Sequence, residues 1–133
     1  MGKVYQLKYK IWIESNDGES LLGEGKWQLL KAIKHYGSLQ LAVRKMGYSY
    51  RQTWSNLKKI EEKLGFQLIE KHRGGEMGGK TVLTQRGEEL VSFFDELYQQ
   101  SSSGFMRYLV ENEEKLNMLL LETDEYNQLK SNP

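Results

Sequence analysis

The stretch GSLQLAVRKMGYSYRQTWSNLKKIEEKLG, residues 37–65, decides the fold of this chain. Ser38 is a suitable N-terminal cap for a short helix, LQLAVRKM, which the glycine at position 47 ends. Only two residues separate that glycine from a second helical run, which Ser49 caps. Two helices joined by so tight a glycine turn, with the small Ala42 where they would cross, form a helix-turn-helix.

The second of these helices is predicted over about residues 50–64 and has two different faces. Its inward stripe consists of Thr53, Leu57, Ile60 and Leu64. The opposite face is polar, basic and aromatic, and consists of Tyr50, Arg51, Trp54, Ser55, Lys58 and Lys59. Acidic residues enter this face only at Glu61 and Glu62, beyond the part that would enter a major groove. The N-terminal half could therefore lie in that groove, where Arg pairs with guanine and Ser or Tyr meets backbone oxygens.

Some residues of this face also have a structural interpretation. The ring of Trp54 could instead pack against the preceding helix or against the strands that follow, as large aromatic side chains commonly do. Lys58 and Lys59 could be ordinary solvated surface.

The segments around the helix-turn-helix complete a winged helix. The stretches FQLIEK and TVL, on either side of the glycine-rich residues 73–81, predict two strands around a tip. Before the helix-turn-helix, residues 4–14 alternate as a half-buried strand, a turn and the short SLL follow, and a helix is predicted from Glu24 to about His35. Thr84 caps a further helix through Gln100, with Leu90, Phe93, Phe94 and Leu97 on one side.

The SSSG sequence at residues 101–104 predicts a break, followed by a last helix from Phe105 to about Glu122 and a frayed tail. The predicted fold class is mainly α with a small amount of β structure (α+β): a winged helix-turn-helix with an N-terminal β-hairpin and C-terminal helices. The predicted organisation is a DNA-binding domain over residues 1–100 and a C-terminal helix and tail over residues 105–133.

Composition excludes several classes of function. No apolar run approaches the length needed to span a bilayer, and the N-terminus has no signal core, so we expect no membrane partner. The absence of cysteine removes thiolate metal sites and disulfides and fits a reducing, cytoplasmic compartment. With only two histidines, His35 and His72, we expect no catalytic zinc, no nucleophile–His–carboxylate set, no cofactor and no enzymatic activity.

Charge is divided along the chain, although the net charge is only +1. Residues 34–80 contain ten Lys or Arg against four Asp or Glu, whereas residues 88–125 contain two against ten. A segregated basic block is typical of a surface that binds a polyanion, and the acidic block would have to point elsewhere. A merely solvated charged surface is the alternative.

The glycine-rich stretch RGGEMGGKT, residues 73–81, also contains the phosphate-loop pattern G-x-x-x-x-G-K-T. In a nucleotide-binding protein that loop must lead directly into a helix. Here the next helix is predicted to begin only at Thr84, so Lys80 and Thr81 should lie on a strand. We therefore expect no nucleotide, and interpret the glycines as a wing that lies along DNA phosphates.

A resemblance adds to this interpretation. The stretch from Gly37 to Lys71 is similar to the winged helix-turn-helix of LysR-type transcription factors. The sequences YKIWIE, LLGEGKWQLLKAI, YSYRQTW and RGGEMGGKTVLTQRGEEL further resemble the N-terminal DNA-binding domain of ModE-type, molybdate-responsive regulators. This resemblance covers roughly residues 5–100. It differs in the wing, where Glu76 and Met77 interrupt a run that is almost entirely Gly and Lys in that family.

The resemblance implies a homodimer whose third helix reads the operator and whose wing follows the DNA backbone. By position, the recognition roles fall on Ser49, Tyr50, Arg51 and Trp54, and the wing role on residues 73–80. With the residues of the outward face and the start of the preceding helix, the predicted DNA-binding set is Ser38, Gln40, Ser49, Tyr50, Arg51, Trp54, Ser55, Lys58, Lys59, Arg73 and Lys80.

The predicted function is sequence-specific binding of double-stranded DNA by a homodimeric transcriptional regulator. The alternative is a winged helix that serves as a protein-interaction module without DNA binding. For the dimer contact we expect a stripe of Leu109, Asn112, Leu116 and Leu119, with further apolar surface from Leu90, Phe94 and Leu97, unless these helices fold back on their own domain. Because the residues after Gly104 look helical and acidic, no response to molybdate or tungstate is expected.

Overall fold

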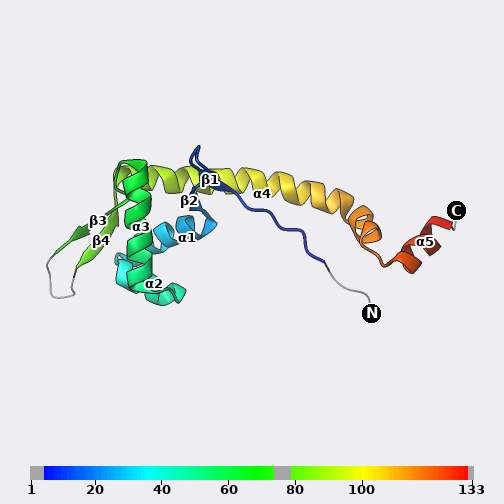
Figure 1. Cartoon of the computed structure of the whole chain (residues 1–133), viewed down its shortest axis with the longest axis horizontal. Helices are drawn as coiled ribbons and strands as arrows, with labels where there is room; N and C mark the ends of the chain where they lie inside the picture. Colours follow the sequence, from blue (N-terminus) through cyan, green and yellow to red (C-terminus); the bar gives the residue numbers. More distant parts are fainter. Residues whose placement is uncertain (1–4, 74–78, 132–133) are drawn as a thin grey trace. The chain divides into compact units, whose positions relative to one another are not determined.

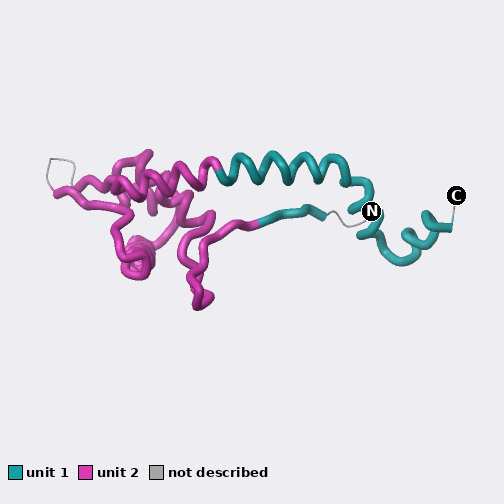
Figure 2. Tube along the Cα trace, turned by 90° about the horizontal axis from the view of Figure 1, so that it is seen from above, with its two compact units in different colours: residues 1–9, 97–133 teal, residues 10–96 magenta. Residues whose placement is uncertain are grey.

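The computed structural model describes residues 5–73 and 79–131, which fall into two compact units (Figure 2). One unit comprises residues 10–96, and the other comprises residues 1–9 and 97–133. The elements in chain order are β1 (Trp12–Glu14), β2 (Ser20–Gly23), α1 (Glu24–Tyr36), α2 (Leu39–Met46), α3 (Tyr50–Leu64), β3 (Ile69–His72), β4 (Lys80–Leu83), α4 (Gln85–Leu119) and α5 (Thr123–Ser131) (Figure 1).

The boundaries of α2 and α3 follow from local chemistry. The hydroxyl of Ser38 accepts a hydrogen bond from the Leu41 N–H at 3.2 Å, and the hydroxyl of Ser49 accepts one from the Gln52 N–H at 3.3 Å. These side chains satisfy amides that the first helical turn leaves without a partner. Glycines at positions 37, 47 and 65 end α1, α2 and α3 with φ of 71°, 73° and 82°, a left-handed conformation that favours glycine. The predicted helix-turn-helix is confirmed.

Residues 10–96 surround one apolar core. α1 packs against α2 and β4, and α2 packs against α3. The core side chains are Leu22, Leu29, Leu30, Ile33, Leu39, Ala42, Val43, Leu57, Ile60, Leu68, Ile69, Leu83, Val91 and Phe94. Full burial of a Val, Leu, Ile or Phe side chain contributes about 1.5–3 kcal/mol to the free energy of folding. Ala42 is fully buried, as the tight helix pair requires.

The β3–β4 hairpin is the predicted wing, and its residues pair from Ile69↔Leu83 to His72↔Lys80. Thr81 joins the hairpin to the turn between α1 and α2. Its N–H donates to the Gly37 carbonyl at 2.9 Å, and its buried hydroxyl accepts from the Leu39 N–H at 3.1 Å. The hairpin is therefore fixed to the helix-turn-helix at its base, and the α+β winged-helix fold class is confirmed.

The prediction of a long N-terminal strand was wrong. Only Trp12–Glu14 pair with β2, and residues 5–11 are not in a strand. The alternation of residues 4–14 suits a strand, but β2 has only four residues and cannot pair with the rest. The alternation of residues 4–14 predicted that one side, which includes Tyr5, Leu7 and Ile13, would be buried, but these three side chains are exposed. Within the second unit, the rings of Tyr9 and Phe105 lie 4.6 Å apart.

The predicted break at residues 101–104 was also wrong, since α4 continues through them. The Ser101 hydroxyl donates to the Leu97 carbonyl at 2.7 Å, and the Ser103 hydroxyl donates to the Gln99 carbonyl at 2.9 Å. Serine side chains can thus bond to the preceding turn without ending the helix. The expected frayed tail is in part helical as well, since α5 spans Thr123–Ser131.

The expected apolar side of the helix after Thr84 needs one correction. Phe94 is 2% exposed and belongs to the core, whereas Phe93 is 59% exposed and faces away from it. Leu90 and Leu97 are half-buried. Adjacent residues on a helix point about 100° apart, so both phenylalanines could not share one narrow stripe.

No helix in the described ranges is long and apolar enough to cross a membrane.

Candidate nucleic-acid interface

The N-terminal half of α3 presents the predicted reading face. Arg51 and Ser55 are exposed, and neither side chain has a hydrogen bond or ion pair within the described residues. Ser49 is also exposed, but its hydroxyl already caps the helix. A capped helix with an exposed guanidinium and hydroxyl has the chemistry needed to contact base edges and phosphates.

Lys71 of β3 lies against the rings of both Tyr50, which is exposed, and Trp54. The Lys71 Nζ is 4.9 Å from the Tyr50 ring centroid and 4.1 Å from that of Trp54, and it also contacts the Tyr50 hydroxyl. Trp54 is half-buried and lines a hollow of about 270 Å³ together with Ile69. The structural interpretation of Trp54, packing against a strand, therefore describes its position in the free protein.

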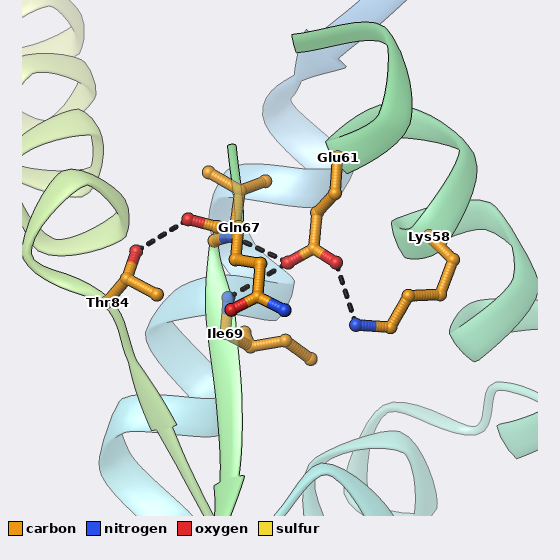
Figure 3. Close-up of polar contacts among 6 residues, drawn as sticks. Lys58, Glu61, Gln67, Ile69 and Thr84 are labelled. Atoms are coloured by element: carbon orange, nitrogen blue, oxygen red, sulfur yellow. Dashed lines mark hydrogen bonds and ion pairs between the residues drawn. The ribbon is translucent and has the colours of Figure 1, made fainter. Parts of the chain in front are cut away.

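Lys58 lies in the same cluster but has a carboxylate partner. Its Nζ is 4.3 Å from the Trp54 ring centroid and 2.8 Å from Oε1 of Glu61 (Figure 3). Glu61, which the sequence assigned to the polar face, is 6% exposed. The charge of Lys58 is thus balanced internally, so Lys58 is a weaker candidate for a phosphate contact than Arg51.

Lys59 lies on the other flank of α3. It lines a separate hollow of about 430 Å³, beside the start of α1, together with Lys26, Asn56 and Lys63. Lys63 is paired with Glu19. The predicted set therefore divides, with Lys58 facing the wing and Lys59 facing α1 and β2.

The remaining predicted residues lie on α2 and the hairpin. Ser38 caps α2, and Gln40 is exposed in its first turn. Arg73 and Lys80 are exposed at the outer end of the β3–β4 hairpin. The tip itself, including Glu76 and Met77, lies outside the described residues.

The phosphate-loop pattern occurs in a geometry that differs from that of a nucleotide site. Lys80 and Thr81 begin β4, and α4 begins only at Gln85, so no helix follows the loop directly. The hydroxyl of Thr81 is buried and bonded to the Leu39 N–H, where it cannot hold a magnesium ion. The prediction that these two residues lie on a strand is confirmed.

Ion pairs lower the number of free positive charges in the basic part of the chain that the sequence suggested. Lys34 pairs with Glu88 at 3.0 Å, and Lys31 pairs with Asp95 at 3.2 Å, which also accepts from the Trp27 indole at 2.8 Å. Two acidic residues in the first three turns of α4 thus neutralise two lysines of α1. Within the described ranges, the exposed basic residues of the block without a carboxylate partner are Arg44, Lys45, Arg51, Lys59, Lys71, Arg73 and Lys80.

Two residues of this region were missed by reasoning from the sequence. Lys71 is two positions after the buried Ile69 in a strand, so both belong to the face that meets α3. Glu61 is seven positions after Trp54 and therefore lies on the same flank of the helix. Both signals were present, but identifying them required knowing that β3 packs against that flank.

Comparison with known proteins agrees with the fold. Residues 25–88 match the family described as bacterial regulatory helix-turn-helix proteins of the lysR family. The molybdenum-pterin-binding protein MopB of Rhodobacter capsulatus is 31% identical over 97 residues, which cover 73% of this chain and 34% of MopB. The transcriptional regulator ModE of Haemophilus influenzae is 32% identical over 78 residues, or 59% of this chain and 31% of that protein.

The DNA-binding transcriptional dual regulator ModE of Escherichia coli is 32% identical over 77 residues, or 58% of this chain and 29% of that protein. The chain therefore spans about a third of the length of these relatives.

Proposed function

We propose that this chain binds double-stranded DNA and regulates transcription, because residues 25–88 match the family of bacterial regulatory helix-turn-helix proteins of the lysR type. The ModE relatives are named as transcriptional regulators, and the similarity to them covers more than half of this chain. Such a protein would work in the cytoplasm, where the DNA is. It would need no catalytic chemistry of its own.

One observation carries this proposal. Arg51 and Ser55 are exposed on the capped N-terminal half of α3, and the β3–β4 hairpin lies beside that helix (Figure 1). A major groove about 12 Å wide admits one helix, and Arg can make two hydrogen bonds to one guanine. The cations Arg73 and Lys80 would then meet phosphates next to the groove.

A second copy of the chain would double this surface. We expect the dimer contact on α4, where Tyr108 and Val110 are 68% and 69% exposed and Leu119 is also exposed. Leu109, Asn112 and Leu116 of the predicted stripe are half-buried. Phe94 cannot contribute, because it lies in the core of residues 10–96.

The test begins with selection of bound sequences from random duplex DNA by the 133-residue chain. Affinity for the selected sequence is then compared among wild type, Arg51→Ala and Arg107→Ala. Arg107 is an exposed arginine of α4, so its removal makes the same change in net charge.

Arg51→Ala should cost about 1–3 kcal/mol and relax the preference at one base pair, whereas Arg107→Ala should change neither. If no sequence is enriched, or if both variants bind alike, the groove assignment fails. The protein-interaction alternative would then take its place.

Molybdate is not expected to act on these 133 residues. The residues of α4 and α5 that follow Gly104 are rich in Glu and Asp, which repel an oxyanion. Thermal melts with and without millimolar molybdate at fixed ionic strength should superimpose. An upward shift with molybdate would contradict this expectation, since a ligand that binds the folded state must stabilise it.

A further inference from the structure

Glu61 of α3 is buried, and both of its carboxylate oxygens have polar partners. Its Oε2 accepts hydrogen bonds from the N–H groups of Leu68 at 2.6 Å and Ile69 at 3.1 Å, and its Oε1 pairs with Lys58 at 2.8 Å (Figure 3). Leu68 directly precedes β3, the first strand of the wing, and Ile69 is its first residue. One carboxylate thus connects the last turn of the recognition helix to the base of the wing.

The same segment is held from its other side by the start of α4. The Thr84 hydroxyl donates to the Gln67 carbonyl at 2.7 Å (Figure 3). The Thr84 N–H donates to the Leu68 carbonyl at 2.9 Å. Gly87 permits this approach, because a Cβ at that position would lie 2.4 Å from the Leu68 carbonyl oxygen. Residues 67–69 are therefore fixed between α3 and α4, with Glu61 as the link to α3.

Burial of a carboxylate is unfavourable unless hydrogen bonds and a counter-charge compensate for the lost water. An apolar side chain at this position would not carry the cost of desolvation, but it could not accept from two backbone amides. Glu61 is therefore suited to setting a defined distance between α3 and β3, which non-directional apolar packing does less strictly.

We propose that Glu61 is a positioning residue for DNA binding: it holds the wing at the distance from α3 at which Arg51 and Lys80 engage one DNA duplex together. This inference rests on the proposed function. Glu61 itself does not touch DNA in this account, since it is buried beneath Lys58 and β3.

Two conservative substitutions of Glu61 separate the effect of its side-chain length from the effect of its charge. Glu61→Asp keeps the negative charge near Lys58 but withdraws the carboxylate by one methylene, out of range of the two amides. Glu61→Gln keeps the side-chain length and an oxygen that can accept from both amides, but it loses the charge. If Glu61 acts by position, the Asp variant is the defective one.

The readout is the salt dependence of DNA binding, which counts phosphate contacts. Lys80→Ala should lower the slope of log K against log salt by about 1. We call this decrease in slope the Lys80 step. It should persist when Glu61 is replaced by Gln. It should disappear when Glu61 is replaced by Asp, because a displaced wing no longer brings Lys80 to the phosphate. A loss of folded protein would lower the apparent affinity but leave the step intact.

The matched control is Glu62→Asp, the same change at the exposed neighbouring residue, where the Lys80 step should stay at its wild-type size. Circular dichroism confirms that each variant is folded at the assay temperature, and Glu61→Ala, which removes both reach and charge, should also lose the step.

Three outcomes overturn the inference. One is a Lys80 step of equal size in the Asp, Gln and wild-type backgrounds, and another is its loss in Gln but not in Asp. The third is that Lys80→Ala leaves the salt slope of the otherwise wild-type protein unchanged. That result would also contradict the proposed contact between the wing and a DNA phosphate. Arg51→Ala then decides separately whether reading of DNA by α3 survives.

Discussion

Arg51 and Lys58 lie on the same exposed side of α3 and carry the same charge, but their surroundings differ. Arg51 has no partner among the described residues, whereas Lys58 is held by the Glu61 carboxylate and the Trp54 ring. A cation that is already paired gains less from a phosphate, because its internal contact must be given up. The two residues should therefore differ in what their removal affects.

Lys58→Met should lower the free energy of unfolding by about 1–2 kcal/mol, because it leaves the buried Glu61 without its counter-charge. The Lys58 side chain is 37% exposed, so solvent moderates this loss. Urea unfolding measures it. Lys59→Met, at the exposed neighbour, should change stability by less than about 0.5 kcal/mol. Equal stability of the two variants would indicate that the Lys58–Glu61 pair contributes nothing to folding.

Thr81 allows a second test at the scale of one residue. Thr81→Val keeps the shape of the side chain but removes the acceptor of the Leu39 N–H, so it should cost about 1–3 kcal/mol of folding free energy. Thr81→Ser keeps the hydroxyl and should lose less. Urea denaturation of both variants checks the order, and a Val variant as stable as wild type would show that this hydrogen bond is dispensable.

At the scale of elements, α4 is the part that differs most from expectation. Its serines bond to carbonyls of the preceding turn, and a Cβ at Gly104 would meet nothing within 4 Å. Gly87, on the same helix, faces the Leu68 carbonyl at close range. Two glycines of one helix thus have opposite local requirements.

Gly104→Ala should strengthen α4 by about 1 kcal/mol, because alanine favours a helix interior over glycine and the site is open. Gly87→Ala should instead lower the stability of the fold by about 1–3 kcal/mol through overpacking. Hydrogen exchange of the amides that follow position 104 measures the first effect, and thermal unfolding measures the second. Faster exchange in Gly104→Ala would argue for a break at this point after all.

Reasoning from sequence succeeded where a boundary depends on local chemistry. Ser38, Ser49 and Thr84 cap the expected helices because each side chain reaches an amide three residues later. It failed where the outcome depends on a distant partner. The alternation of residues 4–14 could not reveal that β2 is short, and the place of Glu61 could not be known without β3.

At the scale of the whole molecule, charge segregation is weaker in space than along the chain. Glu88 and Asp95 of α4 pair with Lys34 and Lys31 of α1, so part of the acidic block serves the fold of residues 10–96. The acidic residues after position 104 belong to the other unit. Of the basic block, only the exposed Lys and Arg residues without a carboxylate partner remain available to bind a polyanion.

The dimer prediction belongs to this scale. Light scattering should give the mass of two chains at micromolar concentration, because α4 exposes large apolar side chains in its second half. Leu116→Glu, a charge in the predicted stripe, should shift the mass towards one chain. Glu113→Gln, an exposed residue of the same helix, should not. A single-chain mass for wild type would favour helices that fold against their own chain.

The hairpin residues Gly79, Lys80 and Thr81 also show how a sequence pattern can arise without its usual meaning. Each has its own reason: a Cβ at Gly79 would lie 3.3 Å from the His72 carbonyl oxygen, Lys80 is exposed at the strand end, and the buried Thr81 hydroxyl accepts from an amide. These independent demands reproduce the G-K-T signature of nucleotide-binding loops. A pattern search for such enzymes would therefore match this winged helix, although its threonine hydroxyl is buried against a backbone amide and is not free to hold a metal ion.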